Sequence, residues 1–202
     1  MAIRAALFDM DGTIYDSNID WLALRAEIKI PWDGRPILAQ LADTDEETRA
    51  RGAAALHRVE AEGARNGALI EGTPELLSTL REHGMRCALV TNNSRASAEE
   101  VLSRYDLSFE VVLTREDGRA KPDPHLFLLA LDRLGVAPQD ALVIGDAHLD
   151  AIAAQAAGVP RVVLVGTSEW MREHLPEDSR HHEAADLHHV REIVLRLLGD
   201  GA

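Results

Sequence analysis

The sequence predicts an α/β fold in which a parallel sheet is covered by helices on both faces and a helical segment is inserted after the first strand. Short apolar runs recur along the 202 residues, and amphipathic helical segments separate them. Strands that are apolar throughout are typical of a parallel sheet buried on both faces. This alternation stops between Tyr15 and Gly72, where helical patterns appear without a clear strand.

Five apolar runs are predicted to form the buried strands. They are Ile3 to Phe8, Cys87 to Val90, Val111 to Leu113, Ala141 to Ile144, and Val162 to Val165. None of them shows the alternation of apolar and polar residues that is typical of a half-exposed strand. The single cysteine, Cys87, lies in the second run, and we interpret it as a small buried hydrophobic residue without chemistry.

Start and stop signals predict the helices that connect these strands. Thr73 and Pro74 begin one helix that Gly84 ends, and Ser97 and Glu100 fit a capping box of the next. Asp123-Pro124 begins a helix that Gly135 ends. Gly158 stops a helix over Leu149 to Ala157, and Asp186 caps a last helix to about Leu198. A proline in the first turn and a glycine after the last turn are the usual positions of these residues in helices.

The inserted segment has two helical patterns of its own. One runs from Ile19 to Ile30, and the other runs from Asp45 to Gly63 after a capping box of Thr44 and Glu47. We therefore expect a core of residues 1–14 and 73–202 and an inserted helical unit of residues 15–72.

Charge and hydropathy restrict the possible partners. The formal net charge is −13, which disfavours nucleic acid and anionic membrane surfaces because both bind basic faces. No apolar run approaches the roughly 20 residues of a membrane helix, and Asp9 and Asp11 interrupt the apolar N-terminus before a signal peptide is complete. We expect a cytoplasmic protein, a monomer or weak homodimer, that acts on a small molecule.

The first predicted strand ends in a pair of acidic residues. Asp9 and Asp11 are separated by one residue and are followed by Gly12 and Thr13. In an open parallel sheet, ligands bind beyond the carboxyl ends of the strands, where this pair falls. One carboxylate can act as a nucleophile and the other as a neighbouring acid or base, with glycine permitting the sharp turn. An isolated pair of this kind more often only caps a loop.

Polar residues of complementary chemistry follow other predicted strands. Thr91 and Asn92 follow the second strand, where a hydroxyl and backbone N–H groups can hold phosphate oxygens. Lys121, one of two lysines in the chain, precedes a helix, and Asp146 and Asp150 follow the fourth strand. Carboxylate oxygens are the ligands that Mg²⁺ prefers. Each feature alone is common, but their occurrence together and in order at strand ends favours an enzyme site.

These four features together resemble the signature motifs of the haloacid dehalogenase-like hydrolases, and the resemblance spans about Ile3 to Val165. It implies a Rossmann-like core with a small helical cap inserted after the first motif, as in phosphoglycolate phosphatases and β-phosphoglucomutases. It further implies Mg²⁺-dependent hydrolysis of a small phosphate monoester through an aspartyl-phosphate. A phosphoglycolate-like substrate is the first candidate.

The resemblance also implies a role for each motif residue. Asp9 would attack phosphorus, while Asp11 would protonate the leaving oxygen and later activate water. Thr91 and Asn92 would bind the phosphoryl group, and Lys121 would pair with Asp9 and phosphate. The metal would be held by Asp9, the Asp11 carbonyl and Asp146, with Asp150 acting as a ligand or through water. Ala147 departs from the family pattern because many relatives carry a hydroxyl or amide there.

Other activities compete with this one. Dehalogenases of the family lack the carboxylate that Asp11 provides, and phosphonatases place a small residue there and a lysine in the cap. A phosphosugar mutase of the β-phosphoglucomutase type has the same motifs and stays open. A receiver-like signalling protein also carries an Asp cluster, but its phosphorylated Asp follows the third strand and no helices are inserted.

The inserted segment offers candidates for substrate contact. Trp21, Arg25 and Lys29 follow one another at i, i+4 spacing on the first inserted helix, either as a surface face with one packed tryptophan or as specificity residues. The nine histidines include the pairs His181-His182 and His188-His189 in a polar segment. There we expect solvated side chains rather than a metal site. His148 is expected at the surface, at a helix start.

Overall fold

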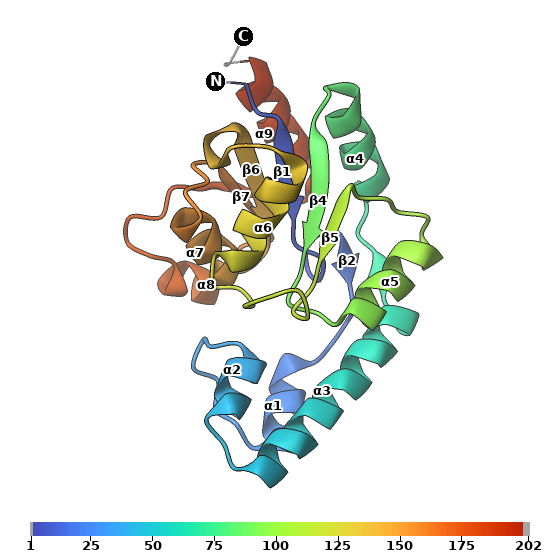
Figure 1. Ribbon diagram of the computed structural model, residues 1–202, viewed down its shortest axis with the longest axis vertical. Coiled ribbons are helices and arrows are strands. Elements are labelled where there is room, and N and C mark those ends of the chain that lie inside the picture. Colours follow the sequence, from blue (N-terminus) through green and yellow to red (C-terminus); the bar gives the residue numbers. More distant parts are fainter. Residues whose placement is uncertain (1, 200–202) are drawn as a thin grey trace.

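The computed structural model of the protein describes residues 2–199 and has a six-stranded sheet at its centre (Figure 1). The strand order is β5-β4-β1-β6-β7-β8, and every neighbouring pair is parallel. The strands are β1 Ala5–Phe8, β4 Arg86–Val90, β5 Val111–Leu113, β6 Ala141–Gly145, β7 Val162–Val165 and β8 His182–Ala184. The predicted fold class is confirmed, and the five predicted strands match β1 and β4 to β7.

Helices cover both faces of this sheet. One face carries α4 Thr73–Glu82, α5 Arg95–Arg104 and α9 Leu187–Gly199. The other carries α6 His125–Leu134, α7 His148–Ala156 and α8 Glu169–His174, and a short 3₁₀ helix, Pro138–Asp140, precedes β6. Among residues 2–199, no helix is both long enough and apolar enough to cross a membrane.

The alternation of side chains along β1 explains why these strands are apolar throughout. Ala6 and Phe8 belong to the core beneath α4, α5 and α9, whereas Ala5 and Leu7 belong to the core beneath α6, α7 and α8. All four side chains are fully buried. Successive residues of a strand point to opposite faces, so a strand between two helix layers needs an apolar residue at every position.

The inserted segment forms a unit with its own small core, below the sheet in Figure 1. It contains α1 Trp21–Ile28, α2 Ile37–Ala42 and α3 Glu46–Asn66, and α3 is the long helix along its outer side. The two segments that connect the inserted unit to the core pair as a short antiparallel ribbon, β2 Tyr15–Asp16 with β3 Ala68–Leu69. The sequence does not predict this ribbon, because two residues are too few to show a period. We call residues 15–72 the cap below.

Two predicted capping boxes are wrong. α5 begins after Ser94, whose side chain accepts a hydrogen bond from the backbone N–H of Ser97, so Ser97 is not the cap. α3 is capped by Asp45, whose carboxylate accepts from the backbone N–H of Thr48. In both cases a residue close to the predicted cap, Ser94 or Asp45, accepts a hydrogen bond from a free N–H group at the helix start. The spacing of the residues did not distinguish this cap from the predicted one.

The polar segment after β7 is more ordered than its composition indicated. It contains α8 and the edge strand β8, neither of which was predicted. In β8 the side chains of His182 and Glu183 are exposed and only Ala184 is buried. A short edge strand with one buried residue has no apolar run to reveal it. The predicted cap of the last helix is confirmed, since Asp186 Oδ1 accepts from the backbone N–H of His189.

Candidate active site

The carboxyl ends of three neighbouring strands meet at one cavity. β1 lies between β4 and β6, so Asp9 follows the central strand while Thr91 and Asp146 follow its two neighbours. After β1 the chain continues in the sheet to β4 on one side, whereas after β6 it continues to β7 on the other, and ligands bind at such a reversal of strand order in open parallel sheets. The cavity has a volume of about 1120 Å³ and is lined by residues of both the core and the cap.

Lys121 is the centre of the charged cluster at the base of this cavity. Its Nζ donates to Asp9 Oδ1 at 2.7 Å, to Asp150 Oδ1 at 2.6 Å and to the carbonyl of Val90 at 3.0 Å. The side chain is buried. A buried ammonium with three acceptors is held in one position, because any other position leaves it or its carboxylates without a partner.

The carboxylates beside Lys121 form a group that fits a metal ion. One oxygen from each of Asp9, Asp146 and Asp150 lies within 4.8 Å of the others. Asp150 is already engaged, because Lys121 donates to its Oδ1 and the backbone N–H of Ala147 donates to its Oδ2. Three carboxylates share one lysine, so the cluster has room for further positive charge, and hard oxygen donors suit Mg²⁺ or a similar cation.

The acidity of these groups reflects burial and crowding. Burial raises the pKa of Asp9 to about 6, although the charge of Lys121 opposes the shift and Asp150 adds to it. Burial and the neighbouring charges of Asp9 and Asp150 raise the pKa of Asp146 well above its usual value. The pKa of Lys121 is raised, because the attraction of Asp150 and Asp9 outweighs the effect of burial. The cluster therefore favours binding of a cation.

Asp11 lies on the turn that leaves β1 toward the cap. Its Oδ1 accepts a hydrogen bond from the backbone N–H of Ser17 at 2.9 Å. Burial raises the pKa of Asp11, while hydrogen bonding from Ser17 opposes the shift. A carboxyl group with a raised pKa holds a proton closer to neutral pH, which suits an acid that donates and then accepts a proton.

Gly12 makes the approach of this turn to Asp146 possible. It has φ +80°, and a Cβ atom placed on it would collide with the carboxylate of Asp146. We expect Gly12→Ala to lower activity at least about tenfold, because a displacement on the order of 1 Å of a catalytic group has this effect or more. Activity is measured with a saturating general substrate at several metal concentrations.

A matched control separates the steric contact from backbone strain. Gly84 has φ +71°, and a Cβ atom added there would meet no atom of the described residues within 4 Å, so Gly84→Ala introduces only the left-handed strain. That strain costs roughly 1–2 kcal/mol in the free energy of unfolding. If both variants lose the same stability and neither loses activity, the contact between position 12 and Asp146 is unimportant.

Thr91 and Asn92 lie on the cavity wall but differ in what their side chains contact. The Thr91 hydroxyl is buried and accepts from the backbone N–H of Asn93 at 3.1 Å, which leaves its proton free to be donated. The Asn92 amide instead pairs with the backbone of Lys121: Nδ2 donates to the carbonyl at 2.9 Å, and Oδ1 accepts from the N–H at 2.8 Å. The Asn92 side chain thus holds the lysine loop, a role that its place in the sequence did not indicate.

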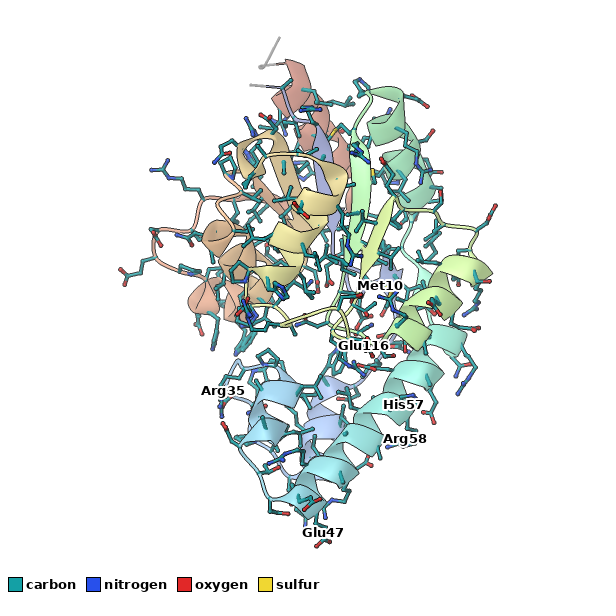
Figure 2. All side chains as sticks on the ribbon, viewed as in Figure 1. Met10, Arg35, Glu47, His57, Arg58 and Glu116 are labelled. Atoms are coloured by element: carbon teal, nitrogen blue, oxygen red, sulfur yellow. The ribbon has the colours of Figure 1, made fainter. Side chains whose placement is uncertain are left out.

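The cap contributes two of its three candidate residues to the cavity. Trp21 and Arg25 line it, but Lys29 does not. α1 ends at Ile28, and Lys29 is its left-handed cap with φ 61°, so the i, i+4 spacing does not continue to it. Lys29 is exposed. Arg35, which sequence analysis did not single out, also lines the cavity and lies on the side of the cap that faces the core (Figure 2).

Cap and core are joined on two sides of the cavity. On one side the Arg115 guanidinium forms a two-point ion pair with Glu60 of α3, with Nη2 2.9 Å from Oε2, and also donates to the carbonyl of Asn92. On the other side His148 Nε2 lies 3.0 Å from the carbonyl of Gly34. The expectation that His148 is a surface residue is wrong, since it is 8% exposed.

None of these joining contacts has a local sequence signal. Glu60 and Arg115 are 55 residues apart, and His148 and Gly34 are 114 residues apart. A lone Glu on a helix usually belongs to a solvated face, and only the placement of the cap over the sheet buries this one. Within residues 2–199, the one group of three side chains that fits a metal ion is Asp9, Asp146 and Asp150, and this group contains no histidine.

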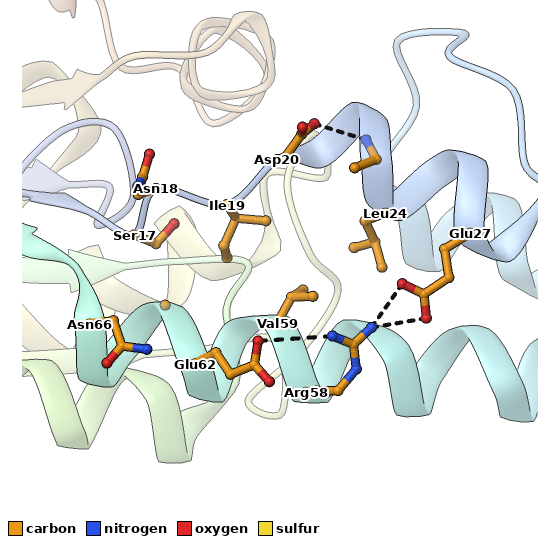
Figure 3. A pocket seen from close by; sticks show the side chains of 12 residues that line it. Ser17, Asn18, Ile19, Asp20, Leu24, Glu27, Arg58, Val59, Glu62 and Asn66 are labelled. Carbon is orange, nitrogen blue, oxygen red and sulfur yellow. Dashed lines mark hydrogen bonds and ion pairs between the residues drawn. The ribbon is translucent and has the colours of Figure 1, made fainter.

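A second, smaller cavity lies between α1 and α3 (Figure 3). Its volume is about 410 Å³. Its arginine is already paired with both of its glutamates, because Arg58 Nη2 lies 2.8 Å from Glu27 Oε2 and Arg58 Nη1 lies 3.9 Å from Glu62 Oε2. None of the motif residues of the core lines it. The larger cavity at the strand ends is therefore the candidate active site.

Comparison with known proteins agrees with this choice. The family model of the haloacid dehalogenase-like hydrolases matches residues 3–158. The N-acetylmuramic acid 6-phosphate phosphatase of Pseudomonas aeruginosa is 30% identical over 96% of this chain and 94% of its own. A phosphoglycolate phosphatase of Xanthomonas campestris pv. campestris is 33% identical over 79% of this chain and 81% of its own. The crystal structure of a hydrolase from Pseudomonas syringae superimposes with a TM-score of 0.80, at 22% identity, over 96% of this chain and 99% of that chain.

Proposed function

The chain belongs to the haloacid dehalogenase-like hydrolases, and from this premise we propose that it hydrolyses a small phosphate monoester with Asp9 as the nucleophile and Mg²⁺ as the cofactor. One observation carries the proposal. Four motifs that are far apart in the sequence meet at one cavity, where Lys121 Nζ lies 2.7 Å from Asp9 Oδ1 and the carboxylate of Asp146 lies beside them.

The first step transfers the phosphoryl group to Asp9. Lys121 occupies Asp9 Oδ1, which leaves Oδ2 to attack phosphorus. The bond from phosphorus to the leaving oxygen breaks as the bond to Asp9 forms, and Asp11 donates its proton to the leaving oxygen. With a pKa of about 6, Asp9 is ionised above that pH and available as a nucleophile.

The second step hydrolyses the aspartyl-phosphate. Asp11, now ionised, accepts a proton from a water molecule, whose oxygen attacks phosphorus and releases inorganic phosphate and the Asp9 carboxylate. The Lys121 ammonium, whose three N–H groups are already engaged, would supply positive charge beside the phosphoryl oxygens, and the Thr91 hydroxyl would donate its proton to one of them. Splitting the reaction in this way suits phosphate monoesters, whose uncatalysed hydrolysis is extremely slow.

The metal would be held by Asp9 and Asp146, with the carbonyl of Asp11, and Asp150 would act through a water because both its oxygens are engaged. When bound, Mg²⁺ supplies positive charge that neutralises the crowded carboxylates and the phosphoryl oxygens. Ala147 provides no side-chain ligand, so Asp146 carries more of this task here than where a hydroxyl or amide follows it.

The names of two relatives support an acidic substrate. One relative is named for N-acetylmuramic acid 6-phosphate and another for phosphoglycolate, both phosphate monoesters of acids. We retain phosphoglycolate as the first candidate and a phosphorylated sugar as the second. A phosphosugar mutase would use the same core residues, but it would not release inorganic phosphate in proportion to the substrate consumed.

We expect the purified protein to release inorganic phosphate from p-nitrophenyl phosphate in the presence of Mg²⁺ and to lose this activity in EDTA. The carboxylate cluster has one lysine for three acids, so without a divalent cation the phosphoryl group meets uncompensated negative charge. Phosphate release is followed colorimetrically before and after Mg²⁺ is restored. Full activity in EDTA would exclude the metal requirement, and absence of turnover with every phosphate monoester tested would exclude the phosphatase function.

A further inference from the structure

All three tryptophans of the chain line the active-site cavity. They are Trp21 of α1, Trp32 of the loop between α1 and α2, and Trp170 of α8. Aromatic residues make up only 4% of the chain, so this concentration is not a consequence of composition. Trp32 is 44% exposed, and its ring centroid lies 4.8 Å from that of Trp170 across the gap between cap and core. Exposed indole rings on a cavity wall offer flat apolar contact to a ligand.

Arg25 lies beside Trp32 and is the buried cation of the cap side of the cavity. It is 7% exposed, and its guanidinium carbon lies 4.7 Å from the centre of the Trp32 ring. Nη1 donates to Gln40 Oε1 at 2.8 Å and Nη2 donates to the carbonyl of Arg35 at 2.9 Å. Both acceptors are neutral, and the buried Nε–H has no partner in the described part of the chain. The guanidinium is therefore oriented but not neutralised.

The nearby carboxylates are committed to another residue. Asp33 and Asp43 each lie 2.8 Å from a nitrogen of Arg35. Within residues 2–199, Arg25 makes no ion pair with a carboxylate inside 4.0 Å, and burial lowers its pKa although Asp33 partly opposes this. A buried charge without a counter-ion is costly, and a bound anion removes that cost. An arginine held by two hydrogen bonds and a ring also loses little entropy when it binds a planar carboxylate.

The dimensions of the cavity indicate the body of the ligand. Pockets of roughly 300–1,000 Å³ hold drug-sized molecules, and this cavity of about 1120 Å³ is larger than a two-carbon acid fills. The phosphoryl group belongs at Asp9 and Lys121, in the core, whereas Arg25 and Trp32 lie on the cap. A ligand that reaches both needs a body between its two anionic groups, and the tryptophans favour one with an apolar ring face.

We propose that Arg25, held against Trp32, is a second anion-binding residue of the active-site cavity, and that the substrate is a phosphate monoester of a cyclic acid whose carboxylate Arg25 binds. This proposal rests on the phosphatase function, and it replaces phosphoglycolate, the first substrate candidate, with a larger cyclic acid. It assigns the positive charge in the cap to Arg25 rather than to Lys29, which is exposed and off the cavity wall.

The test compares two ligands that differ in one group. Glucuronic acid 1-phosphate and glucose 1-phosphate share a ring and a phosphate, but only the first carries a carboxylate. Dissociation constants are measured by tryptophan fluorescence with Mg²⁺ on the Asp9→Asn protein, which we expect to turn over neither ligand. We expect the acid to bind about tenfold to a hundredfold more tightly, as is typical of a hydrogen-bonded charge. We expect this ratio to fall to about one when Arg25→Gln is added.

The control is Arg49→Gln. Arg49 also donates to cap carbonyls, those of Leu41, Ala42 and Thr44, but does not line the cavity. This variant should keep the ratio of the two dissociation constants. If Arg25→Gln does not fold, Arg25→Lys replaces it, and a ratio below that of the arginine protein supports the proposal because lysine lacks the planar fork.

Two results would overturn the proposal: a ratio near one while Arg25 is present, and a ratio that no Arg25 variant changes. Equal weakening of both ligands by Arg25→Gln is a case of the second result and would mean that Arg25 only stabilises the cap. Because these measurements report binding, they stand apart from the turnover of p-nitrophenyl phosphate by the unmodified protein. Failure of that turnover would count against the phosphatase function, and failure of the binding ratio against the Arg25 site.

Discussion

Replacing Asp9 by asparagine is expected to abolish turnover while the fold stays intact. Asparagine has nearly the shape of aspartate, and its amide oxygen still accepts from Lys121 Nζ, but it does not attack phosphorus. The loss of a nucleophile costs on the order of 10³-fold or more in kcat. The backbone N–H of Asp9 donates to the carbonyl of Ile144 at 2.9 Å, and this contact with β6 is unaffected.

The measurement has a chemical readout as well as a kinetic one. Intact mass spectrometry after mixing with substrate should show no phosphoryl adduct on Asp9→Asn, whereas Asp11→Asn should accumulate one because water is no longer activated. Asp132→Asn, on the exposed side of α6, controls for loss of one negative charge and should behave as the unmodified protein. Asp9→Asn activity within tenfold of the unmodified protein would remove Asp9 from the nucleophile role.

Replacing Lys121 by methionine is expected to cost both activity and stability. Lys121 is the buried ammonium between Asp9 and Asp150, at 2.7 and 2.6 Å. Its removal leaves two buried carboxylates without a cation, and breaking a buried pair in this way costs about 3–5 kcal/mol in the free energy of unfolding. Loss of the charge next to the phosphoryl group should lower kcat by a further factor on the order of 10²–10³.

The stability loss should depend on pH in a defined direction. Lys121 lowers the pKa of Asp9 against the larger effect of burial, so without it the pKa of Asp9 rises above the value of about 6 that it has beside the lysine. A carboxyl group whose pKa is higher in the folded state destabilises the fold once pH exceeds its unfolded value, and does not do so below it. In metal-free buffer, the loss should therefore be larger near pH 8 than near pH 4.

The other lysine of the chain provides the control. Lys29→Met removes an exposed charge at the end of α1, where no carboxylate of residues 2–199 forms an ion pair with it. It should leave both the unfolding free energy and kcat close to those of the unmodified protein. Equal stability losses for the two lysine variants, or a Lys121→Met loss that is the same at all pH values, would contradict the assignment of Lys121 as the counter-charge of the site.

The parts of this structure that could be predicted from sequence are those determined by local pattern. β1 is apolar at each of its four positions because helices cover both sides of it, so an uninterrupted run of apolar residues was enough to predict the strand. The residues at its end were predictable because the carboxyl ends of parallel strands meet at one edge of the sheet. Lys121 accordingly lies against Asp9, as the resemblance implied, whereas its hydrogen bond to Asp150 was not predicted.

Features that depend on how the cap lies on the core were not predictable in the same way. Glu60 and His148 are buried by partners that lie far away in the sequence, Arg115 and Gly34 respectively. Lys29 was grouped with Arg25 by spacing, yet the helix ended one residue before it. Asn92 was expected to bind the phosphoryl group, and the two hydrogen bonds between its side-chain amide and the backbone of Lys121 were not predicted. Each of these outcomes depends on tertiary placement rather than on propensity.

The double hydrogen bond between the Asn92 side chain and the Lys121 backbone has a consequence for how this enzyme can change. It joins the loop after β4 to the loop before α6. The Lys121 ammonium in turn joins these loops to Asp9 after β1 and to Asp150 of α7. These hydrogen bonds fix the two loops, β1 and α7 relative to one another, so a substitution that moves one of them displaces the others. The cap instead meets the core through separate contacts, among them those at Glu60, Gly34 and Trp32. New substrate preferences should therefore arise through substitutions in the cap, because a residue can be exchanged there without displacing the catalytic residues of the core.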